Sequence, residues 1–258
     1  MIDPKKLLTK AINEANWVFS GRETKRGWRI LLYHSVGTRL SFDKRSVLTV
    51  TQEQFKAQML ALKESSSLNI IPLSPPQDYS ALSLSITFDD GFANNLYLAA
   101  PILIELGIPF TVFVTTDHLK QSGPLYLDKA GLKKLSNIKL CTIGSHTLTH
   151  RPLAELSGSE IRSELTKSKA ILEDLTQATV TTLAYPFGSA NPKIADIARD
   201  AGYKLAVSTH IGSNEAGRNQ FMLKRTEICT QDGRRQFCLK VNGAWDWRAT
   251  LLKDPLNI

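Results

Sequence analysis

Short apolar runs alternate with amphipathic helical segments along most of this chain, and this alternation limits its possible folds more than any other feature. The apolar runs predict strands at 29–34, 69–73, 82–88, 109–115, 138–144, 180–185, 203–209 and 221–228. Helical patterns occupy 51–62, 93–106, 128–135, 157–175, 191–202 and 234–241. Because strands separated by helices pair in parallel, we expect an α/β fold with a mainly parallel sheet of about seven strands.

Several predicted helices begin with recognisable capping residues. Thr51 with Gln54, and Ser157 with Glu160, have the spacing of a capping box, in which two side chains satisfy backbone N–H groups reciprocally. Asn191 is an N-cap candidate that precedes a proline, the residue favoured at the first helical position. These signals support the helix assignments independently of the apolar periodicity.

Composition bounds the class of protein. Three cysteines lie far apart with no Cys-x-x-Cys pattern, which favours reduced thiols and a cytoplasmic location. The net charge of +8 suits anionic partners, but basic residues are not interleaved with aromatic ones, so nucleic-acid binding is not expected. No stretch approaches the roughly 20 apolar residues of a membrane-spanning helix, and the N-terminus lacks the pattern of a secretory signal.

We expect residues 25–258 to form one domain, since β/α barrels of this length are routinely single units. Residues 1–24 contain apolar side chains at helical spacing, with Lys5, Lys6 and Lys10 beside them. This segment is expected to be an amphipathic helix packed on the domain. The alternative is a peripheral anchor to an anionic membrane, which would place the cytoplasmic protein at the inner membrane face.

The residues best suited to chemistry follow the ends of predicted strands. Asp89 and Asp90 come directly after one strand, and His146 and His150 come just after another. Because ligands bind at the carboxyl ends of parallel strands, we expect these four side chains to meet. One carboxylate and two imidazoles hold a divalent metal and leave positions open for water and substrate, while the second carboxylate acts as a base. The alternatives are a helix cap for the two acids and ordinary hydrogen bonding for the histidines.

These residues resemble the motifs of the polysaccharide deacetylase family, also called the NodB-homology family or carbohydrate esterase family 4. Residues 87–91 read Thr-Phe-Asp-Asp-Gly, residues 145–150 read Ser-His-Thr-x-x-His, and residues 184–188 read Ala-Tyr-Pro-Phe-Gly, similar to a third family motif. Residues 32–36, Leu-Tyr-His-Ser-Val, resemble the bacterial branch that acts on cell-surface and exported polysaccharides. The resemblance covers about 29–228 and implies a distorted (β/α)7 barrel.

The resemblance also implies roles for the matching residues. Asp90, His146 and His150 would bind the metal, and Asp89 would be the general base. The metal is most simply Zn²⁺, although Co²⁺, Ni²⁺ or Mn²⁺ also accepts nitrogen and oxygen ligands.

The third motif supplies the groups expected to face the substrate. The backbone N–H of Phe187, which follows Pro186, would help the metal to stabilise the oxyanion. The rings of Tyr185 and Phe187 are candidates to stack on sugar faces.

Two of the family features that have no clear counterpart in the sequence concern the base and the acid. Ala184 stands where the family commonly has an arginine that orients the base, and Arg225 is our candidate to replace it, with a surface charge as the alternative. No Leu-x-His motif supplies a catalytic acid, so His34 and His210, each near the end of a predicted strand, are the candidates. For both histidines, hydrogen bonding or substrate contact is the alternative role.

The implied function is a metal-dependent deacetylase that removes N-acetyl groups from a surface glycan of the lipopolysaccharide, O-antigen or capsule type. The partner would be the N-acetylated glycan or its lipid- or nucleotide-linked precursor. One alternative is a metal amidohydrolase that acts on a small non-sugar amide. Another is a non-catalytic carbohydrate-binding or scaffold protein that retains the metal site, which the missing arginine and acid motifs motivate.

Overall fold

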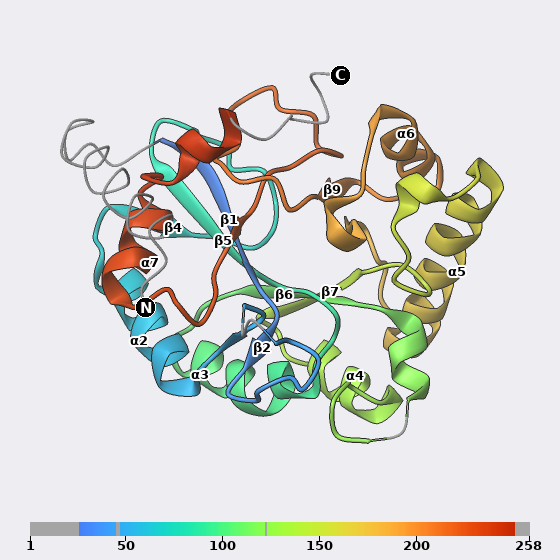
Figure 1. Cartoon of the computed structure of the whole chain (residues 1–258), viewed down its shortest axis with the longest axis horizontal. Helices are drawn as coiled ribbons and strands as arrows, with labels where there is room; N and C mark the ends of the chain where they lie inside the picture. The colour runs from blue at the N-terminus through green and yellow to red at the C-terminus, as the bar shows by residue number, and fades with distance from the viewer. Residues whose placement is uncertain (1–25, 45–46, 122, 251–258) are drawn as a thin grey trace.

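A strongly curved parallel sheet forms the centre of the computed structural model, which describes residues 26–44, 47–121 and 123–250 (Figure 1). The predicted helix at 1–24 lies outside the described residues. Seven strands follow the path β10–β1–β5–β6–β7–β8–β9, and every pairing along it is parallel. These strands are β1 Gly27–Tyr33, β5 Leu82–Phe88, β6 Phe110–Val114, β7 Cys141–Ser145, β8 Thr182–Ala184, β9 Leu205–Val207 and β10 Thr226–Glu227. An eighth strand, β4 Leu68–Ile70, pairs with β5 outside this path.

The segment between β9 and β10 joins the two ends of the curved sheet. Leu223 forms a parallel bridge with Val207 of β9, whereas Ile228 donates its N–H to the Leu32 carbonyl of β1. The prediction of one continuous strand at 221–228 is therefore wrong, because this stretch pairs first with β9 and then with β1. The ring that results is the expected distorted barrel of seven strands.

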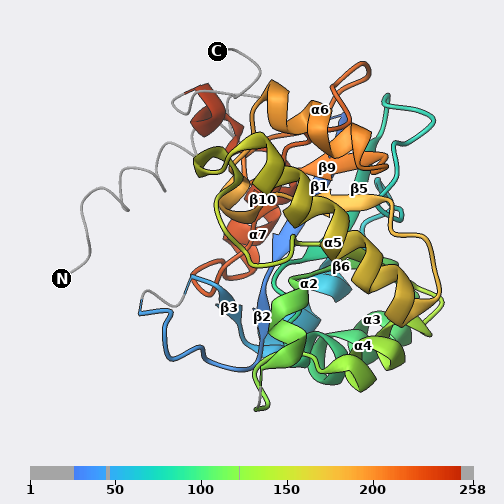
Figure 2. The same ribbon diagram turned by 90° about the vertical axis from the view of Figure 1, so that its right-hand side faces the viewer.

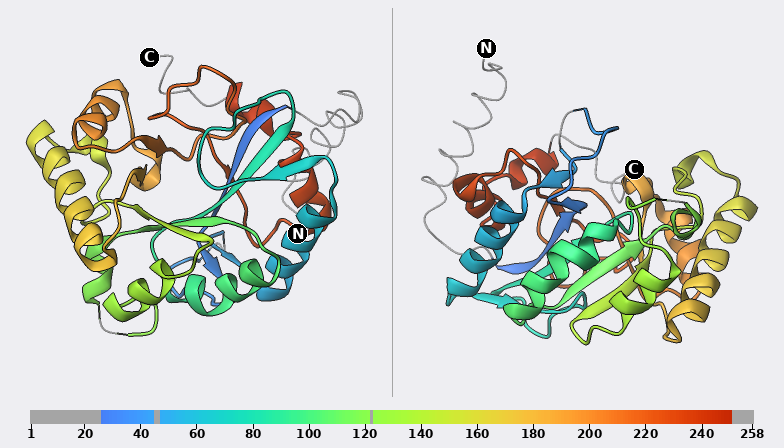
Figure 3. Two further views of the ribbon diagram at one scale, coloured as in Figure 1. Left: turned by 180° about the vertical axis from the view of Figure 1, so that it is seen from behind. Right: turned by 90° about the horizontal axis from the view of Figure 1, so that it is seen from below.

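Helices cover the outer face of the barrel in chain order, as Figures 1 and 2 show. They are α2 Gln52–Glu64, α3 Ala100–Glu105, α4 Lys129–Ser136, α5 Gly158–Thr176, α6 Pro192–Asp200 and α7 Arg234–Val241. Both predicted capping boxes are present, at the starts of α2 and α5, and Asn191 caps α6. Figure 3 shows the same ring of helices from behind and from below. None of the helices in the described ranges has the length and apolar character needed to cross a membrane.

The helix predicted at 93–106 is divided into two parts. A π-helical turn, η1 Asn95–Ala99, precedes α3. Pro101 lies in the first turn of α3, directly after the π-helical turn. Single π-helical turns of this kind are often found at functional sites.

The π-helical turn anchors the chain that leaves β1. Asn95 Nδ2 donates to the His34 carbonyl at 2.8 Å, and Asn94 Oδ1 accepts the Val36 N–H at 3.2 Å. Val36 belongs to a separate small sheet that the sequence did not predict. That sheet pairs β2 Ser35–Val36 with β3 Thr49–Val50. The position of His34 is thereby tied to the segment that follows the carboxylate pair.

Side chains alternate between the two faces of β5, and the alternation divides the core. One face packs under the helices and consists of Leu82, Leu84, Ile86 and Phe88. The other face points into the barrel, where a smaller apolar cluster includes Trp28 and Phe113. Trp28 Nε1 donates to Ser85 Oγ there, and Thr87 Oγ1 donates to the Leu31 carbonyl. Ser85 and Thr87, polar residues on this inner face of β5, are followed along the chain by the carboxylate pair.

An ion pair holds the chain after α7 against β1. Arg29 is fully buried, and its two Nη atoms lie 3.0 and 2.8 Å from the carboxylate oxygens of Asp246. Arg29 Nη1 also donates to Thr226 Oγ1 of β10. The pair therefore connects the first strand, the last strand and the C-terminal end of the described chain.

Candidate active site

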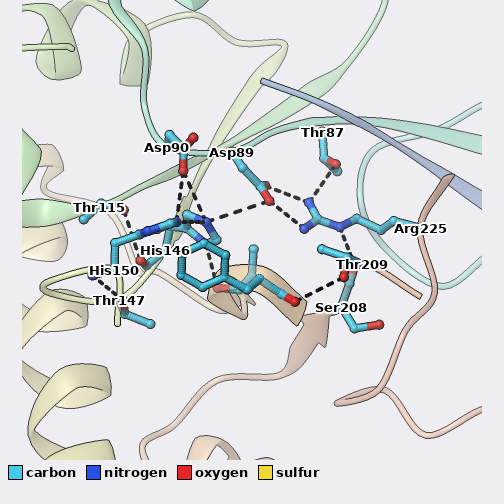
Figure 4. A network of polar contacts seen from close by, with 12 residues as sticks. Thr87, Asp89, Asp90, Thr115, His146, Thr147, His150, Ser208, Thr209 and Arg225 are labelled. Atoms are coloured by element: carbon cyan, nitrogen blue, oxygen red, sulfur yellow. Dashed lines mark hydrogen bonds and ion pairs between the residues drawn. The ribbon is translucent and has the colours of Figure 1, made fainter. Parts of the chain in front are cut away.

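The adjacent carboxylates at the end of β5 point in different directions (Figure 4). Asp89 extends the pairing of β5 by donating its N–H to the Tyr33 carbonyl of β1. Asp90 and Gly91 then both take left-handed conformations, with φ of 72° and 74°. Glycine adopts this conformation at little cost, whereas an aspartate must be held in it by its surroundings. The turn directs one carboxylate to two histidines and the other to an arginine.

Asp90, His146 and His150 converge at the mouth of the barrel. Asp90 Oδ1 lies 3.5 Å from His146 Nε2 and 3.2 Å from His150 Nε2, and the two Nε2 atoms are 3.2 Å apart. Ligands bound tetrahedrally to one metal at about 2.0–2.2 Å lie about 3.3 Å from each other, so these spacings suit a single ion. No other group of three such side chains meets a metal-ligand spacing within the described ranges.

The hydrogen bonding of His146 shows that these residues fit a cation. His146 Nδ1 lies 2.8 Å from the Ala184 carbonyl oxygen, which can only accept, so Nδ1 carries the proton. Burial lowers the pKa of His146 to about 4, so the ring is neutral near pH 7. Its Nε2 then presents a lone pair to the Asp90 carboxylate, an unfavourable contact unless a cation lies between them. The Ala184 carbonyl acts as the outer partner that commonly orients a metal-binding histidine.

Asp90 is ionised despite its burial. Burial by itself would raise the pKa of its carboxyl group, but the hydrogen bond from His150 and the electrostatic effect of the neighbouring His34 and His146 hold that pKa well below its usual value. An ionised carboxylate beside two imidazoles is a hard and borderline donor set that suits several divalent transition metals.

Asp89 is held by a bidentate pair with Arg225. The Nη1–Oδ1 and Nη2–Oδ2 distances are 2.7 and 2.6 Å, and Arg225 Nε donates to the Ser208 carbonyl. Burial would raise the pKa of Asp89, which is only 2% exposed, but the Arg225 charge, assisted by His146, lowers it. Asp89 Oδ2 lies 3.9 Å from His146 Nε2, beside the candidate metal position.

Arg225 reaches this place from the segment that joins β9 to β1. It is fully buried, so the alternative of a surface charge is excluded. Its guanidinium contacts both carboxylate oxygens of the candidate base Asp89.

Strained backbone is concentrated in the site. Five described non-glycine residues have positive φ, and four of them are Asp90, Thr147, His150 and Phe187. A left-handed conformation costs such a residue roughly 1–2 kcal/mol. It persists where surrounding contacts impose it, which is common at active sites.

Comparison with known proteins identifies the family. The sequence model described as Polysaccharide deacetylase matches residues 77–206, about half of the chain, including both carboxylates and both histidines. The chain belongs to the polysaccharide deacetylase family. It is therefore a hydrolase of the class that cleaves N-acetyl amide bonds in polysaccharides.

Two curated relatives of the deacetylase cover most of its length. A putative polysaccharide deacetylase of Bacillus subtilis (strain 168) is 26% identical over 205 residues, 77% of this chain and 70% of that protein. A poly-β-1,6-N-acetyl-D-glucosamine N-deacetylase of Staphylococcus aureus (strain MSSA476) is 26% identical over 196 residues, 70% of this chain and 68% of that protein.

Solved structures confirm the fold. The Streptococcus pyogenes deacetylase PplD in complex with acetate superposes with a TM-score of 0.74 at 23% identity, covering 84% of this chain and 99% of that one. IcaB from Ammonifex degensii gives a TM-score of 0.72 at 21% identity, covering 84% and 97% of the two chains. The barrel architecture expected for the family is thus present.

The third motif of the deacetylase lies at the same mouth, but only part of it is open. Phe187, in the 3₁₀ turn Pro186–Gly188, is 65% exposed, and its ring centroid is 4.8 Å from that of His150. Tyr185 is fully buried, and its hydroxyl donates to the Phe221 carbonyl. The prediction that the Tyr185 ring contacts a sugar is therefore wrong, because neither face of that ring is accessible.

The two candidate acids differ in what surrounds them. His34 contributes to the low pKa of both carboxyl groups, after the larger effects of Arg225 on Asp89 and of the His150 hydrogen bond on Asp90, and His34 Nδ1 is buried with no hydrogen-bond partner among the described residues. His210 accepts the Arg225 N–H with its carbonyl, so its backbone helps to place that arginine. The role of either side chain as an acid stays a prediction.

One site residue had no role assigned from the sequence. His118, in the 3₁₀ turn Thr116–Lys120 after β6, has its Nδ1 3.2 Å from the Asp90 carbonyl oxygen. Its ring stacks on Tyr126 at a centroid distance of 3.9 Å and lies 6.0 Å from the His150 ring. Its position just after a predicted strand was the available signal, but a single histidine without a partner at ligand spacing is not distinctive.

Proposed function

We propose that this deacetylase removes N-acetyl groups from amino-sugar residues of a cell-surface polysaccharide or of its lipid- or nucleotide-linked precursor. The observation that carries the proposal is the placement of the buried Asp89–Arg225 pair beside the converging side chains of Asp90, His146 and His150. The N-deacetylase activity named for the Staphylococcus aureus relative supports an amino-sugar polymer as the substrate class.

The residues divide the work of hydrolysis between them. A divalent metal held by Asp90, His146 and His150, most simply Zn²⁺, would polarise the acetyl carbonyl and lower the pKa of a water molecule. Asp89 Oδ2 accepts a proton from the attacking water, and Arg225 keeps that carboxylate ionised and fixed in orientation. The Phe187 N–H donates to the oxygen on which negative charge develops.

We assign protonation of the leaving nitrogen to His34. Its buried, unpartnered Nδ1 and its electrostatic effect on both carboxylates support this role, and Asn95 holds its backbone. Transfer of a proton to the amide nitrogen accompanies cleavage of the carbon–nitrogen bond, which leaves acetate and a free amino sugar. His34→Ala should lower kcat far more than His210→Ala, and equal losses would contradict the assignment.

The direct test is acetate release by metal-loaded protein from N-acetylated oligosaccharides. We expect turnover of β-1,6-linked N-acetylglucosamine oligomers, with β-1,4-linked oligomers as the comparison substrate. Asp89→Asn should keep the metal and lose activity by at least about 100-fold, the usual effect of removing a proton-transfer group. Asp90→Ala should lose the metal itself. Normal deacetylation by Asp89→Asn would show that Asp89 is not the base.

The alternatives have distinct outcomes in the same assay. Metal binding without acetate release from any glycan would favour a carbohydrate-binding or scaffold protein. Release only from small non-sugar amides would favour an amidohydrolase. The missing family arginine no longer motivates the non-catalytic alternative, since Arg225 contacts both oxygens of Asp89.

A further inference from the structure

The loop that joins the two candidate metal-binding histidines is held by hydrogen bonds to its backbone N–H groups. The N–H of His146 donates to a carbonyl of β6, and the N–H groups of Thr147 and His150 donate to hydroxyls within the segment 145–150. The two central N–H groups, those of residues 148 and 149, have their acceptor on a different element. This outside acceptor therefore helps to fix the central part of the loop.

That acceptor is Glu164 of α5. Its Oε2 accepts the N–H groups of Leu148 and Thr149 at 3.0 and 2.9 Å, and its Oε1 accepts the Thr149 hydroxyl at 2.6 Å. Glu164 is only 6% exposed and lies on the buried face of the helix with Ile161 and Leu165. Within the described chain it forms no ion pair, so these three hydrogen bonds are what offsets the burial of its charge.

The loop needs such an anchor because its conformation is strained. Thr147 and His150 both have positive φ, at 67° and 63°. These two residues bracket the pair of N–H groups that Glu164 binds. The same turn sets the His146 and His150 rings at a centroid distance of 4.8 Å with their Nε2 atoms converging. A shift of the central peptides would therefore move one imidazole relative to the other.

We infer that Glu164 is a positioning residue of the candidate metal centre, whose carboxylate fixes the 146–150 loop so that both imidazoles meet one cation. The inference rests on the proposed function only in taking Asp90, His146 and His150 as the ligands. Glu164 does not touch the metal or the substrate. Outer partners that orient ligands typically change metal affinity by about 10- to 100-fold when they are removed.

The test is the Zn²⁺ dissociation constant of a series of variants, measured by calorimetry on metal-free protein. Glu164→Ala and Glu164→Asp should each weaken binding by about 10-fold or more, since the first lacks the acceptor and the second is too short to reach both N–H groups. Glu164→Gln should stay within about threefold of wild type. Its amide oxygen can accept both N–H groups while its amide nitrogen donates to the Thr149 hydroxyl. The Co²⁺-loaded forms should show altered visible spectra for the Ala and Asp variants alone.

The matched control is Glu160→Ala on the same helix. Glu160 accepts the Ser157 N–H at 2.9 Å in the capping box and an exposed Nη1 hydrogen bond from Arg151 at 3.4 Å, so its loss weakens the start of α5 without removing an acceptor from the backbone of the 146–150 loop. We expect a lower melting temperature but nearly unchanged metal affinity. The inference is overturned if Glu160→Ala loses metal as much as Glu164→Ala, if Glu164→Asp binds like wild type, or if Glu164→Gln is as weak as Glu164→Ala. Wild-type metal binding without glycan turnover would contradict the proposed function and leave this test intact.

Discussion

Asp89 is ionised although it is buried, and the cause is one guanidinium that comes from 136 positions further along the chain. Both members of the pair are shielded from solvent, since Arg225 is fully buried and Asp89 is nearly so. Its charge-assisted, bidentate geometry fixes the orientation of the carboxylate as well as its charge. At the scale of single residues, the base therefore depends on a partner that the third sequence motif does not contain.

Replacing Arg225 by lysine should test this dependence. Lysine keeps a positive charge but cannot form the planar, two-bond contact, so we expect kcat/KM to fall by about 10- to 100-fold with the metal retained. A less stabilised carboxylate has a higher pKa, so the acidic limb of the pH–rate profile should move to higher pH. Asp89 must be deprotonated to act as a base, which sets this direction. An unshifted profile in Arg225→Lys would mean that another group controls that limb.

His118 offers a second test at the residue scale. Its Nδ1–H donates to the Asp90 carbonyl, and so helps to hold that residue at positive φ. His118→Phe keeps a ring against Tyr126 but lacks the donor, and should weaken metal binding several-fold. His118→Asn retains a donor at a similar position and should bind metal more like wild type. Equal affinities in the two variants would show that ring stacking, rather than the hydrogen bond, is what matters.

At the scale of elements, a helix and short irregular segments outside the sheet place the chemical groups that the strands only bring near. The π-helical turn η1 holds the chain at His34, and α5 holds the loop between the two histidines. The segment between β9 and β10 supplies Arg225 and joins the ends of the sheet. The C-terminal part of the described chain is held in turn by the pair between Arg29 and Asp246.

Breaking this last pair should destabilise the fold without altering the site. Asp246→Ala leaves the buried Arg29 charge without its carboxylate partner, and removal of one member of a buried pair costs about 3 kcal/mol. Because Asp246 is 20% exposed, the expected loss lies at the lower end of the roughly 3–5 kcal/mol that such a removal costs. Asp196→Ala, which breaks the exposed pair with Arg199, should cost less than about 1 kcal/mol. Urea unfolding of both variants measures the difference, and equal losses would contradict it.

At the scale of the whole molecule, the barrel buries ionisable groups that stay protonated when folded. Burial raises the pKa of Tyr203 to about 12 and that of Cys229 to about 11, and it also raises the pKa of Tyr185.

Three expectations at this scale stay predictions. They are the single domain at 25–258, the cytoplasmic location and the membrane contact of residues 1–24.

Alkaline pH should therefore destabilise the protein. An unfolded tyrosine ionises near pH 10, whereas folded Tyr203 keeps its proton until about pH 12. The folded state thus binds more protons in this window, and each such group lowers the free energy of unfolding by up to about 1.4 kcal/mol per pH unit. Urea titrations at pH 8 and pH 11 should show the loss, and Tyr203→Phe should reduce its slope. Tyr97→Phe, at an exposed position, should not.

Much of the fold followed from local patterns. Strand β5 and helix α7 have the predicted limits, and both capping boxes are present, because apolar periodicity and capping depend on neighbours in the chain. The strand predicted at 221–228 is wrong because its backbone partners lie far away in the sequence. The helix predicted at 93–106 is divided by a π-helical turn, where the side chains of Asn94 and Asn95 bind the chain that follows β1. In the sequence, the role of Glu164 is indicated only weakly, by a charged residue within the apolar face formed by Ile161 and Leu165.

The sequence by itself determined which donors are present: two carboxylates and two imidazoles after strands whose carboxyl ends share one edge. Only the tertiary structure decided which carboxylate meets the imidazoles, which arginine meets the other, and which ring faces solvent. The physical reason is that ligand spacing and strand order are encoded locally. Ionisation, burial and loop strain depend on groups such as Arg225, Ala184 and Glu164, which packing alone brings within reach.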